Sequence, residues 1–77
     1  MDTQTKILTI LRGVAQKPIE PAPGESLFDS GLLDSFALPD LASALEKEFG
    51  IHIPDRDLTP TKFDSVERIE RYLNSRT

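Results

Sequence analysis

The sequence predicts an all-α fold: a small four-helix bundle of three main helices and one short helix, with a long first loop. Apolar residues recur at helical spacing in three segments, and no two segments alternate as paired strands would. The chain has 77 residues and no cysteine, so its stability has to come from the packing of a few apolar faces. We expect one domain over residues 1–77, with a frayed tail at residues 74–77.

The first helix is expected from Thr3 to Gln16. Its apolar side chains follow the i, i+3, i+4, i+7 pattern of one buried stripe, which consists of Ile7, Ile10, Leu11 and Val14. Asp2 or Thr3 can cap the first turn. The helix should end before Pro18, because a residue that precedes proline is disfavoured in the helical conformation.

A long loop then leads to the second helix. Its first part is rich in residues that exclude regular structure, namely Pro18, Pro21, Pro23 and Gly24. Its second part carries large apolar side chains, namely Leu27, Phe28, Leu32 and Leu33. Because these side chains need burial, we expect the loop to pack across the bundle.

The second helix is expected to begin near Leu38 and to end at Gly50, a residue type favoured in left-handed caps. Its apolar stripe consists of Leu38, Leu41, Ala42, Leu45 and Phe49. Pro39 lacks an N–H group and therefore fits the first helical turn. Ser35 would then lie just before the regular helix.

The rest of the chain is expected to hold a connector, a short helix and the last helix. Residues 51–53, Ile-His-Ile, are predicted to form a buried connector, and residues 60–63 a single short helical turn. The last helix should open at Asp64 or Ser65, with Glu67 placed to complete a capping box with Asp64. Its apolar face consists of Val66, Ile69, Tyr72 and Leu73.

The formal net charge is −4, and the acidic residues are concentrated in the middle of the chain, where residues 20–57 hold nine acidic and two basic side chains. This excess argues against binding to nucleic acid and favours a basic protein partner. No apolar run approaches the ~20 residues that span a bilayer, so no membrane span is expected. Because cysteines and an export signal are both absent from the sequence, we expect a cytoplasmic protein, and we take it to be a monomer.

The common catalytic and metal-binding patterns are missing from the sequence. His52 is the only imidazole, and nothing ties it to a nucleophile, so no catalytic triad is expected. Asp55 and Asp57 lack the spacing of a calcium loop. We therefore predict that the protein is not an enzyme, with no catalytic residues and no metal site.

Ser35, which follows Asp34, is the remaining candidate for chemistry. Asp34 and Ser35 are both residue types that favour helix caps, and the Ser35 hydroxyl can simply cap backbone N–H groups at the start of a helix. The same position also suits a covalently attached phosphate, because a helix N-terminus offers N–H donors and positive potential to an anion. Spacing alone favours the cap, and both alternatives stay open at this point.

The segments around this serine closely resemble the acyl carrier proteins. The resemblance lies in residues 27–36, Leu-Phe-Asp-Ser-Gly-Leu-Leu-Asp-Ser-Phe, and in residues 45–55, and it continues through residues 63–66. It implies that Ser35 receives 4′-phosphopantetheine from coenzyme A through a phosphopantetheinyl transferase, with Asp34 as its motif neighbour. The attached arm would carry an acyl or aminoacyl group as a thioester, and it would supply the thiol that a chain without cysteine lacks.

The resemblance also implies a partner-binding surface. The acidic second helix would offer Asp40, Glu46 and Glu48 to basic docking patches on a loading ligase or synthase and on other partner enzymes. Phe36 and Leu38 would flank the modified serine. Phe36 is either a partner contact or a core residue, and the sequence leaves both possibilities open.

The cargo is not determined by the sequence. Leu45, Ile53 and Phe63 are either plain core, which we favour, or the lining for a tethered acyl chain. Pro39 stands where fatty-acid carriers generally have a β-branched residue, which argues against housekeeping fatty-acid synthesis. Residues 32–36, Leu-Leu-Asp-Ser-Phe, also resemble the D-alanyl carrier proteins and other free-standing carriers of specialised pathways such as secondary metabolism. The alternative from another class is an acidic helical interaction module in which Ser35 is only a helix cap.

Overall fold

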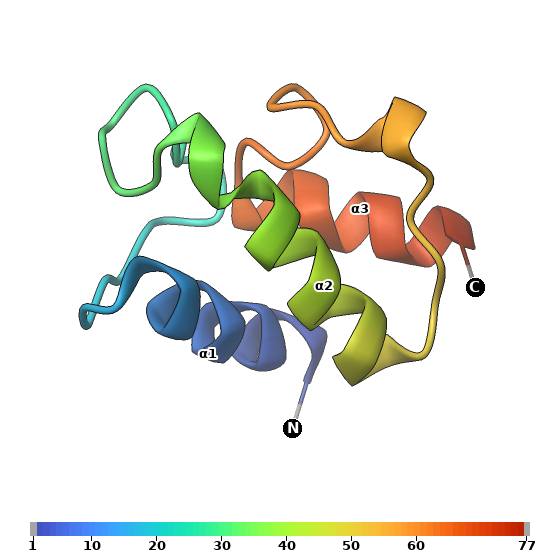
Figure 1. Cartoon of the computed structure of the whole chain (residues 1–77). Helices are drawn as coiled ribbons and strands as arrows, with labels where there is room; N and C mark the ends of the chain where they lie inside the picture. Colours follow the sequence, from blue (N-terminus) through green and yellow to red (C-terminus); the bar gives the residue numbers. More distant parts are fainter. Residues whose placement is uncertain (1, 77) are drawn as a thin grey trace.

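The computed structural model describes residues 2–76, and this range contains three α-helices, two short 3-10 helices and no strand. In chain order the elements are α1 (Thr3–Ala15), η1 (Ser35–Ala37), α2 (Leu38–Phe49), η2 (Asp55–Asp57) and α3 (Val66–Arg76). α1 packs against both α2 and α3, and Figure 1 shows α2 running obliquely across the other two helices. The predicted all-α bundle is confirmed.

α1 begins and ends close to its predicted bounds. The Asp2 carboxylate caps the first turn, where its Oδ1 accepts a hydrogen bond from the Thr5 N–H at 2.7 Å. At the other end, Gln16 adopts a left-handed conformation with φ 58° and does not continue the helix. Ile7 and Leu11 of the predicted stripe are fully buried, so the periodicity identified the inner face correctly.

The long loop between α1 and η1 packs across the bundle, as predicted. Its buried anchors are Ile19, Leu27 and Leu33. Phe28 and Leu32 are partly buried against the same core. Gly31 has a φ of 82°, which glycine adopts without strain. This turn brings Leu33 back to Leu27, whose carbonyl accepts the Leu33 N–H at 2.9 Å.

α2 starts at Leu38 with Pro39 in its first turn, and it is capped by Gly50, whose φ of 64° is left-handed as predicted. The Gly50 N–H donates to the Glu46 carbonyl at 2.9 Å and closes the last turn. The sequence did not indicate η1, the 3-10 turn of three residues that precedes α2 directly.

The short fourth helix lies at a different place from the predicted one. The structure forms η2 at Asp55–Asp57, whereas residues 60–63 form a turn in which the Phe63 N–H donates to the Pro60 carbonyl at 3.2 Å. Phe63 is fully buried, so the chain turns inward there and does not complete a helical turn. Residues 51–53 form an irregular connector, as predicted, but only Ile53 of the three is buried.

α3 is capped by Ser65, whose Oγ accepts a backbone N–H of the first helical turn at 3.1 Å. The predicted capping box is not formed. The Asp64 carboxylate instead accepts a hydrogen bond from Ser26, and the Glu67 carboxylate lies 3.5 Å from the guanidinium of Arg71. The Asp64 carboxylate is thus engaged by a distant segment, and the Glu67 carboxylate by an i,i+4 ion pair within α3.

The tail expected to fray is helical as far as Arg76, and Thr77 lies outside the described residues. The Ser75 hydroxyl donates to the Tyr72 carbonyl at 2.7 Å, and an Arg76 N–H donates to the His52 carbonyl at 3.4 Å. These two bonds hold the last turn of α3 against the preceding turn and against the connector.

The buried apolar side chains form one core to which all three α-helices and the long loop contribute. Its fully enclosed members are Ile7, Leu11, Leu27, Leu41, Leu45, Phe63, Val66 and Ile69. Because the long loop and α2 share this core, η1 between them is supported from both sides.

Candidate functional site

Ser35 is the first residue of η1, at the junction between the long loop and α2 (Figure 1). Its side chain is exposed. The junction forms because residues up to Leu33 are anchored in the core and α2 cannot extend backwards beyond Leu38, where Pro39 marks the first turn. The intervening residues are thereby held at the surface as a single tight turn.

Asp34 caps this turn. Its backbone is extended, with φ −103° and ψ 167°, and its Oδ1 accepts the Phe36 N–H at 3.0 Å. No hydrogen bond of the Ser35 hydroxyl is recorded within residues 2–76, and the residue that precedes α2, Ala37, provides no side-chain cap. The cap function that spacing assigned to Ser35 therefore belongs to Asp34, and the serine hydroxyl is exposed to solvent.

The backbone N–H groups around Ser35 are already in use. The Phe36 N–H donates to the Asp34 carboxylate, the Ala37 N–H to the Asp34 carbonyl at 3.1 Å, and the Leu38 N–H to the Ser35 carbonyl. The expected row of free donors for a phosphate is therefore not available from these residues. A group attached to Ser35 Oγ would extend into solvent and would not lie on these amides.

The two apolar neighbours of Ser35 have opposite environments. Phe36 is 88% exposed, which rules out the core alternative for this side chain. Leu38 is only 6% exposed and belongs to the core, so its side chain offers little surface for the predicted partner contact. Residues two positions apart along a helical segment do not face the same side, so the two side chains do not share one face.

The three carboxylates predicted to form one partner-binding face are separated in the structure. Asp40 is exposed near the start of α2. The Glu46 carboxylate is partly buried, and its Oε2 accepts the Ile53 N–H at 2.7 Å and lies 3.4 Å from the His52 Nδ1. Glu48 faces α1, with its Oε2 3.9 Å from the Lys6 Nζ. Only Asp40 is free of such contacts and adjacent to η1.

The side chains considered as an acyl lining are packed in the core. Leu45 and Phe63 are fully buried, and Ile53 is 6% exposed, in agreement with the favoured plain-core interpretation.

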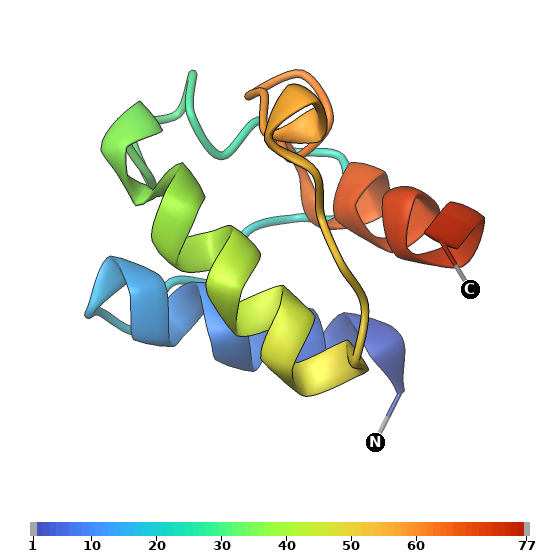
Figure 2. The ribbon, with the colours of Figure 1, turned by 45° about the vertical axis from the view of Figure 1, so that its right-hand side comes forward.

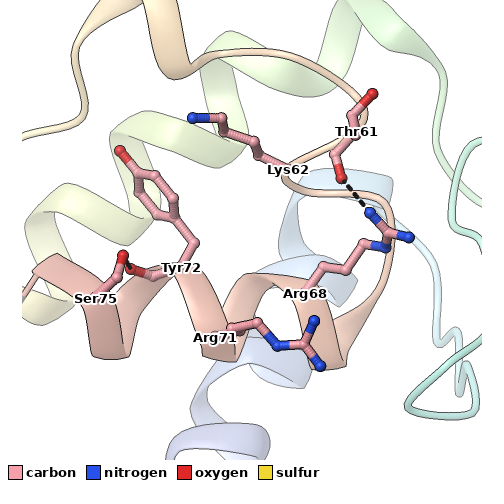
Figure 3. A pocket seen from close by; sticks show the side chains of 6 residues that line it. All are labelled: Thr61, Lys62, Arg68, Arg71, Tyr72 and Ser75. Atoms are coloured by element: carbon pink, nitrogen blue, oxygen red, sulfur yellow. Dashed lines mark hydrogen bonds between the residues drawn. The ribbon is translucent and has the colours of Figure 1, made fainter.

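An open groove of about 280 Å³ lies on a different part of the surface, between α3 and the loop before it (Figure 3). It is lined by Thr61, Lys62, Arg68, Arg71, Tyr72 and Ser75. Asp34 and Ser35 are not among these residues, so the groove is separate from them.

The polar groups of this groove are engaged with the protein itself. The Tyr72 hydroxyl donates to Asp57 Oδ2 at 2.7 Å, and Lys62 Nζ donates to Asp57 Oδ1 at 3.0 Å. The Arg68 guanidinium donates to the Thr61 carbonyl at 3.1 Å, the bond drawn in Figure 3. We therefore interpret the groove as the outer side of a structural contact centred on Asp57, which sequence reasoning had considered only as a metal ligand.

Residues 2–76 offer neither a cluster of metal ligands nor a membrane-spanning helix. No three acidic or histidine side chains there come together as ligands for a metal ion. In the same range, every helix falls short of the length and apolar character needed to cross a bilayer.

Comparison with known proteins identifies the family. The family model described as "Phosphopantetheine attachment site" matches residues 5–73. The chain is 35% identical to the D-alanyl carrier protein of Bacillus subtilis (strain 168), with 90% of this chain and 95% of the relative covered. It is 29% identical to the D-alanyl carrier protein of Lactobacillus helveticus, over 97% of this chain and 95% of the relative. It is 32% identical to aminoacyl carrier protein 1 of Bradyrhizobium diazoefficiens, over 94% of this chain and 82% of the relative. The chain therefore belongs to the phosphopantetheine attachment site family, and it is a carrier protein whose cofactor is a covalently attached phosphopantetheine.

Proposed function

We propose that Ser35 is the attachment residue and that the protein carries an aminoacyl group. The observation that supports the attachment residue best is the division of roles in η1: Asp34 makes the cap, which leaves the Ser35 hydroxyl exposed and without a structural hydrogen bond. A serine that only capped a helix would have its hydroxyl on a backbone N–H.

Loading of this serine is a phosphoryl transfer from coenzyme A. The Ser35 Oγ forms a bond to the phosphorus that bears the pantetheine, and the bond from that phosphorus to the bridging oxygen of the pyrophosphate breaks. Adenosine 3′,5′-bisphosphate leaves with the electron pair, and the hydroxyl proton goes to a base on the transferase. The chain's part is to present the oxygen, and the exposed position in η1 suits that task.

The aminoacyl cargo is proposed from the names of the relatives, and it is compatible with the closely packed core. Relatives are named D-alanyl and aminoacyl carrier proteins. An aminoacyl group is short and polar and needs no apolar tunnel, which fits a protein whose Leu45 and Phe63 are fully enclosed by core packing. We expect a ligase that activates the amino acid with ATP to form the thioester, and we expect the carrier itself to catalyse no step.

The proposed docking surface is smaller than the one that the resemblance suggested. Phe36 follows Ser35 directly, Asp40 lies five residues after it, and both are exposed. They can present an apolar contact and a negative charge to the transferase and to the ligase. A basic patch on the enzyme would complement this surface. The proposed location is the cytoplasm, where coenzyme A is available to a transferase.

The test is intact-mass measurement after incubation with coenzyme A, Mg²⁺ and a broad-specificity phosphopantetheinyl transferase. We expect the parent protein and the control Ser43→Ala, which changes another exposed serine on α2, to gain the mass of one phosphopantetheine. Ser35→Ala should gain none. Equal modification of Ser35→Ala and the parent would show that the attachment site lies elsewhere.

A further inference from the structure

The long loop is tied to the start of α3 by a contact between Ser26 and Asp64, which lie 38 residues apart in the sequence. Ser26 Oγ donates to Asp64 Oδ1 at 2.7 Å, and it also accepts the Asp29 N–H at 3.0 Å. The Leu27 N–H donates to the Asp64 carbonyl. We refer to these three hydrogen bonds as the loop clasp.

A backbone contact supports the loop clasp from the same side. The Glu67 N–H, in the first turn of α3, donates to the Pro23 carbonyl at 2.9 Å. Figure 2 shows the long loop passing beside the start of α3, where these bonds form. Among the bonds named here, only those of Ser26 and the carboxylate of Asp64 depend on side chains, so they are the ones that a substitution can remove.

The loop clasp is connected to the attachment serine by a short path. Leu27, held by Asp64, accepts the Leu33 N–H at 2.9 Å through its own carbonyl. Both leucine side chains are buried, so their positions are fixed by packing as well as by hydrogen bonds. Leu33 is followed directly by Asp34, the cap of η1, and then by Ser35. The loop clasp therefore acts together with the burial of both leucines to restrict the place where η1 begins.

We propose that Ser26 and Asp64 are positioning residues for the transfer of phosphopantetheine to Ser35, an inference that rests on Ser35 being the attachment residue. Neither side chain contacts the Ser35 hydroxyl in the structure. Without the loop clasp, residues 26–33 sample additional conformations, and η1 is presented in its recognised form for only part of the time. The apparent Michaelis constant of the transferase for the carrier then rises in inverse proportion to that fraction, while kcat at saturation stays the same.

The experiment compares Ser26→Ala, which removes both bonds of the hydroxyl, with Ser26→Thr, which retains a hydroxyl. The matched control is Tyr72→Phe, which removes another 2.7 Å hydrogen bond between α3 and a different segment. Rates of mass gain are measured below the melting temperature of every variant. We expect KM to rise roughly 3–10-fold in Ser26→Ala with kcat unchanged, and both Ser26→Thr and Tyr72→Phe to load like the parent.

Amide hydrogen exchange supplies a readout that general destabilisation does not reproduce. In Ser26→Ala the Leu33 N–H should exchange faster than in the parent, while the amides in the middle of α2 keep their rates. Should Ser26→Ala fail to fold, Asp64→Asn provides the same test. This substitution weakens the bond from Ser26, because it removes the charge but keeps an oxygen acceptor. We therefore expect a smaller rise in KM.

An unchanged KM in the variant that folds, or a rise that Tyr72→Phe shows equally, overturns the proposal. Failure of the underlying function has a different signature, since Ser35→Ala would then still gain mass.

Discussion

The carboxylate of Asp57 joins η2 and the following loop to α3 through its hydrogen bonds with Tyr72 and Lys62. The Tyr72 hydrogen bond, followed by that of Lys62, lowers the pKa of Asp57 below its ordinary 3.8. Burial, followed by the hydrogen bond to Asp57, raises the pKa of Tyr72 above its ordinary 10.0. Both shifts favour the same state, an ionised carboxylate that accepts a hydrogen bond from a neutral phenol.

Tyr72→Phe is therefore expected to lower the melting temperature near neutral pH by about 4–8 °C, the effect of one lost hydrogen bond in a domain of this size. Because the pKa of Asp57 is lower in the folded chain, its contribution is present above pH 3.8 and is lost as the pH falls through the folded-state pKa. The raised pKa of Tyr72 adds stability below pH 10.0 that is lost as the pH rises through its folded-state pKa. Calorimetry across the pH range should show that Tyr72→Phe loses less stability than the parent does at both low and high pH.

Asp2 serves as an internal reference when the parent and Tyr72→Phe are compared at acidic pH. Its pKa is also lowered, first by the backbone hydrogen bond from Thr5, so it contributes to acid sensitivity in the parent and in Tyr72→Phe alike. Identical losses of stability on acidification in the two proteins would mean that the Tyr72 bond does not stabilise the ionised form of Asp57.

Phe36 is a large apolar side chain with 88% exposure, so it adds little to the core and is available for contact with another molecule. We predict that Phe36→Ala leaves the melting temperature within about 4 °C of the parent and raises the KM of the transferase or the ligase. Phe49, at the other end of α2, is partly buried. Phe49→Ala should therefore lower the melting temperature and leave the KM at the parental value. The measurement is a melting curve together with loading kinetics, and a destabilised Phe36→Ala with parental kinetics would contradict the docking role.

Within α2, the acidic residues divide into two groups with different tasks. Glu46 accepts the Ile53 N–H and so fixes the connector after Gly50, whereas Asp40 is exposed beside η1. The charges of Glu46 and Asp40 do not reveal this difference. It arises because the connector after Gly50 passes the side of α2 that carries Glu46.

We predict that Glu46→Ala lowers the free energy of unfolding by about 1–3 kcal/mol, because it leaves the partly buried Ile53 N–H without its acceptor. Asp40→Ala should change it by less than about 0.5 kcal/mol. Urea unfolding measures both values. For loading, the order reverses: Asp40→Lys should slow the transferase more than the conservative Glu46→Gln does. Equal unfolding free energies for Glu46→Ala and Asp40→Ala would be incompatible with this division.

Pro39 lies in the first turn of α2, where its missing N–H has no intrahelical partner to lose. Pro39→Ala should therefore be tolerated, with a change of less than about 1 kcal/mol that comes mainly from the greater freedom of the unfolded chain. Urea unfolding tests the stability, and amide exchange at residues 40–42 tests whether the helix start moves. Loss of cooperative unfolding would show that the proline has a structural role that its position does not indicate.

Across the whole molecule, the features that could be predicted are those recorded locally in the sequence. The stripe containing Ile7 and Leu11, the Asp2 cap and the left-handed Gly50 each depend on neighbours within one or two turns, and the Asp-Ser pair at residues 34 and 35 was recognised from a contiguous segment. The bundle and the position of the candidate site followed from these.

What could not be predicted depends on contacts between distant segments. Asp64 was expected to cap α3, but in the folded chain it accepts a hydrogen bond from Ser26. Asp57 had no predicted structural role, because its donor Tyr72 lies 15 residues further along the chain. A carboxylate near a helix start is compatible with either outcome, and only the packed arrangement of the loops decides which donor reaches it.

The central claim, that one exposed serine carries the arm, is tested most directly by locating the modification. Trypsin does not cleave between lysine and proline, so the peptide covering residues 13–47 contains four serines, Ser26, Ser30, Ser35 and Ser43. After incubation with coenzyme A and the transferase, fragmentation of this peptide should place the phosphopantetheine on Ser35 alone. An unmodified Ser35, with the group on another serine or absent from the protein, would contradict the account.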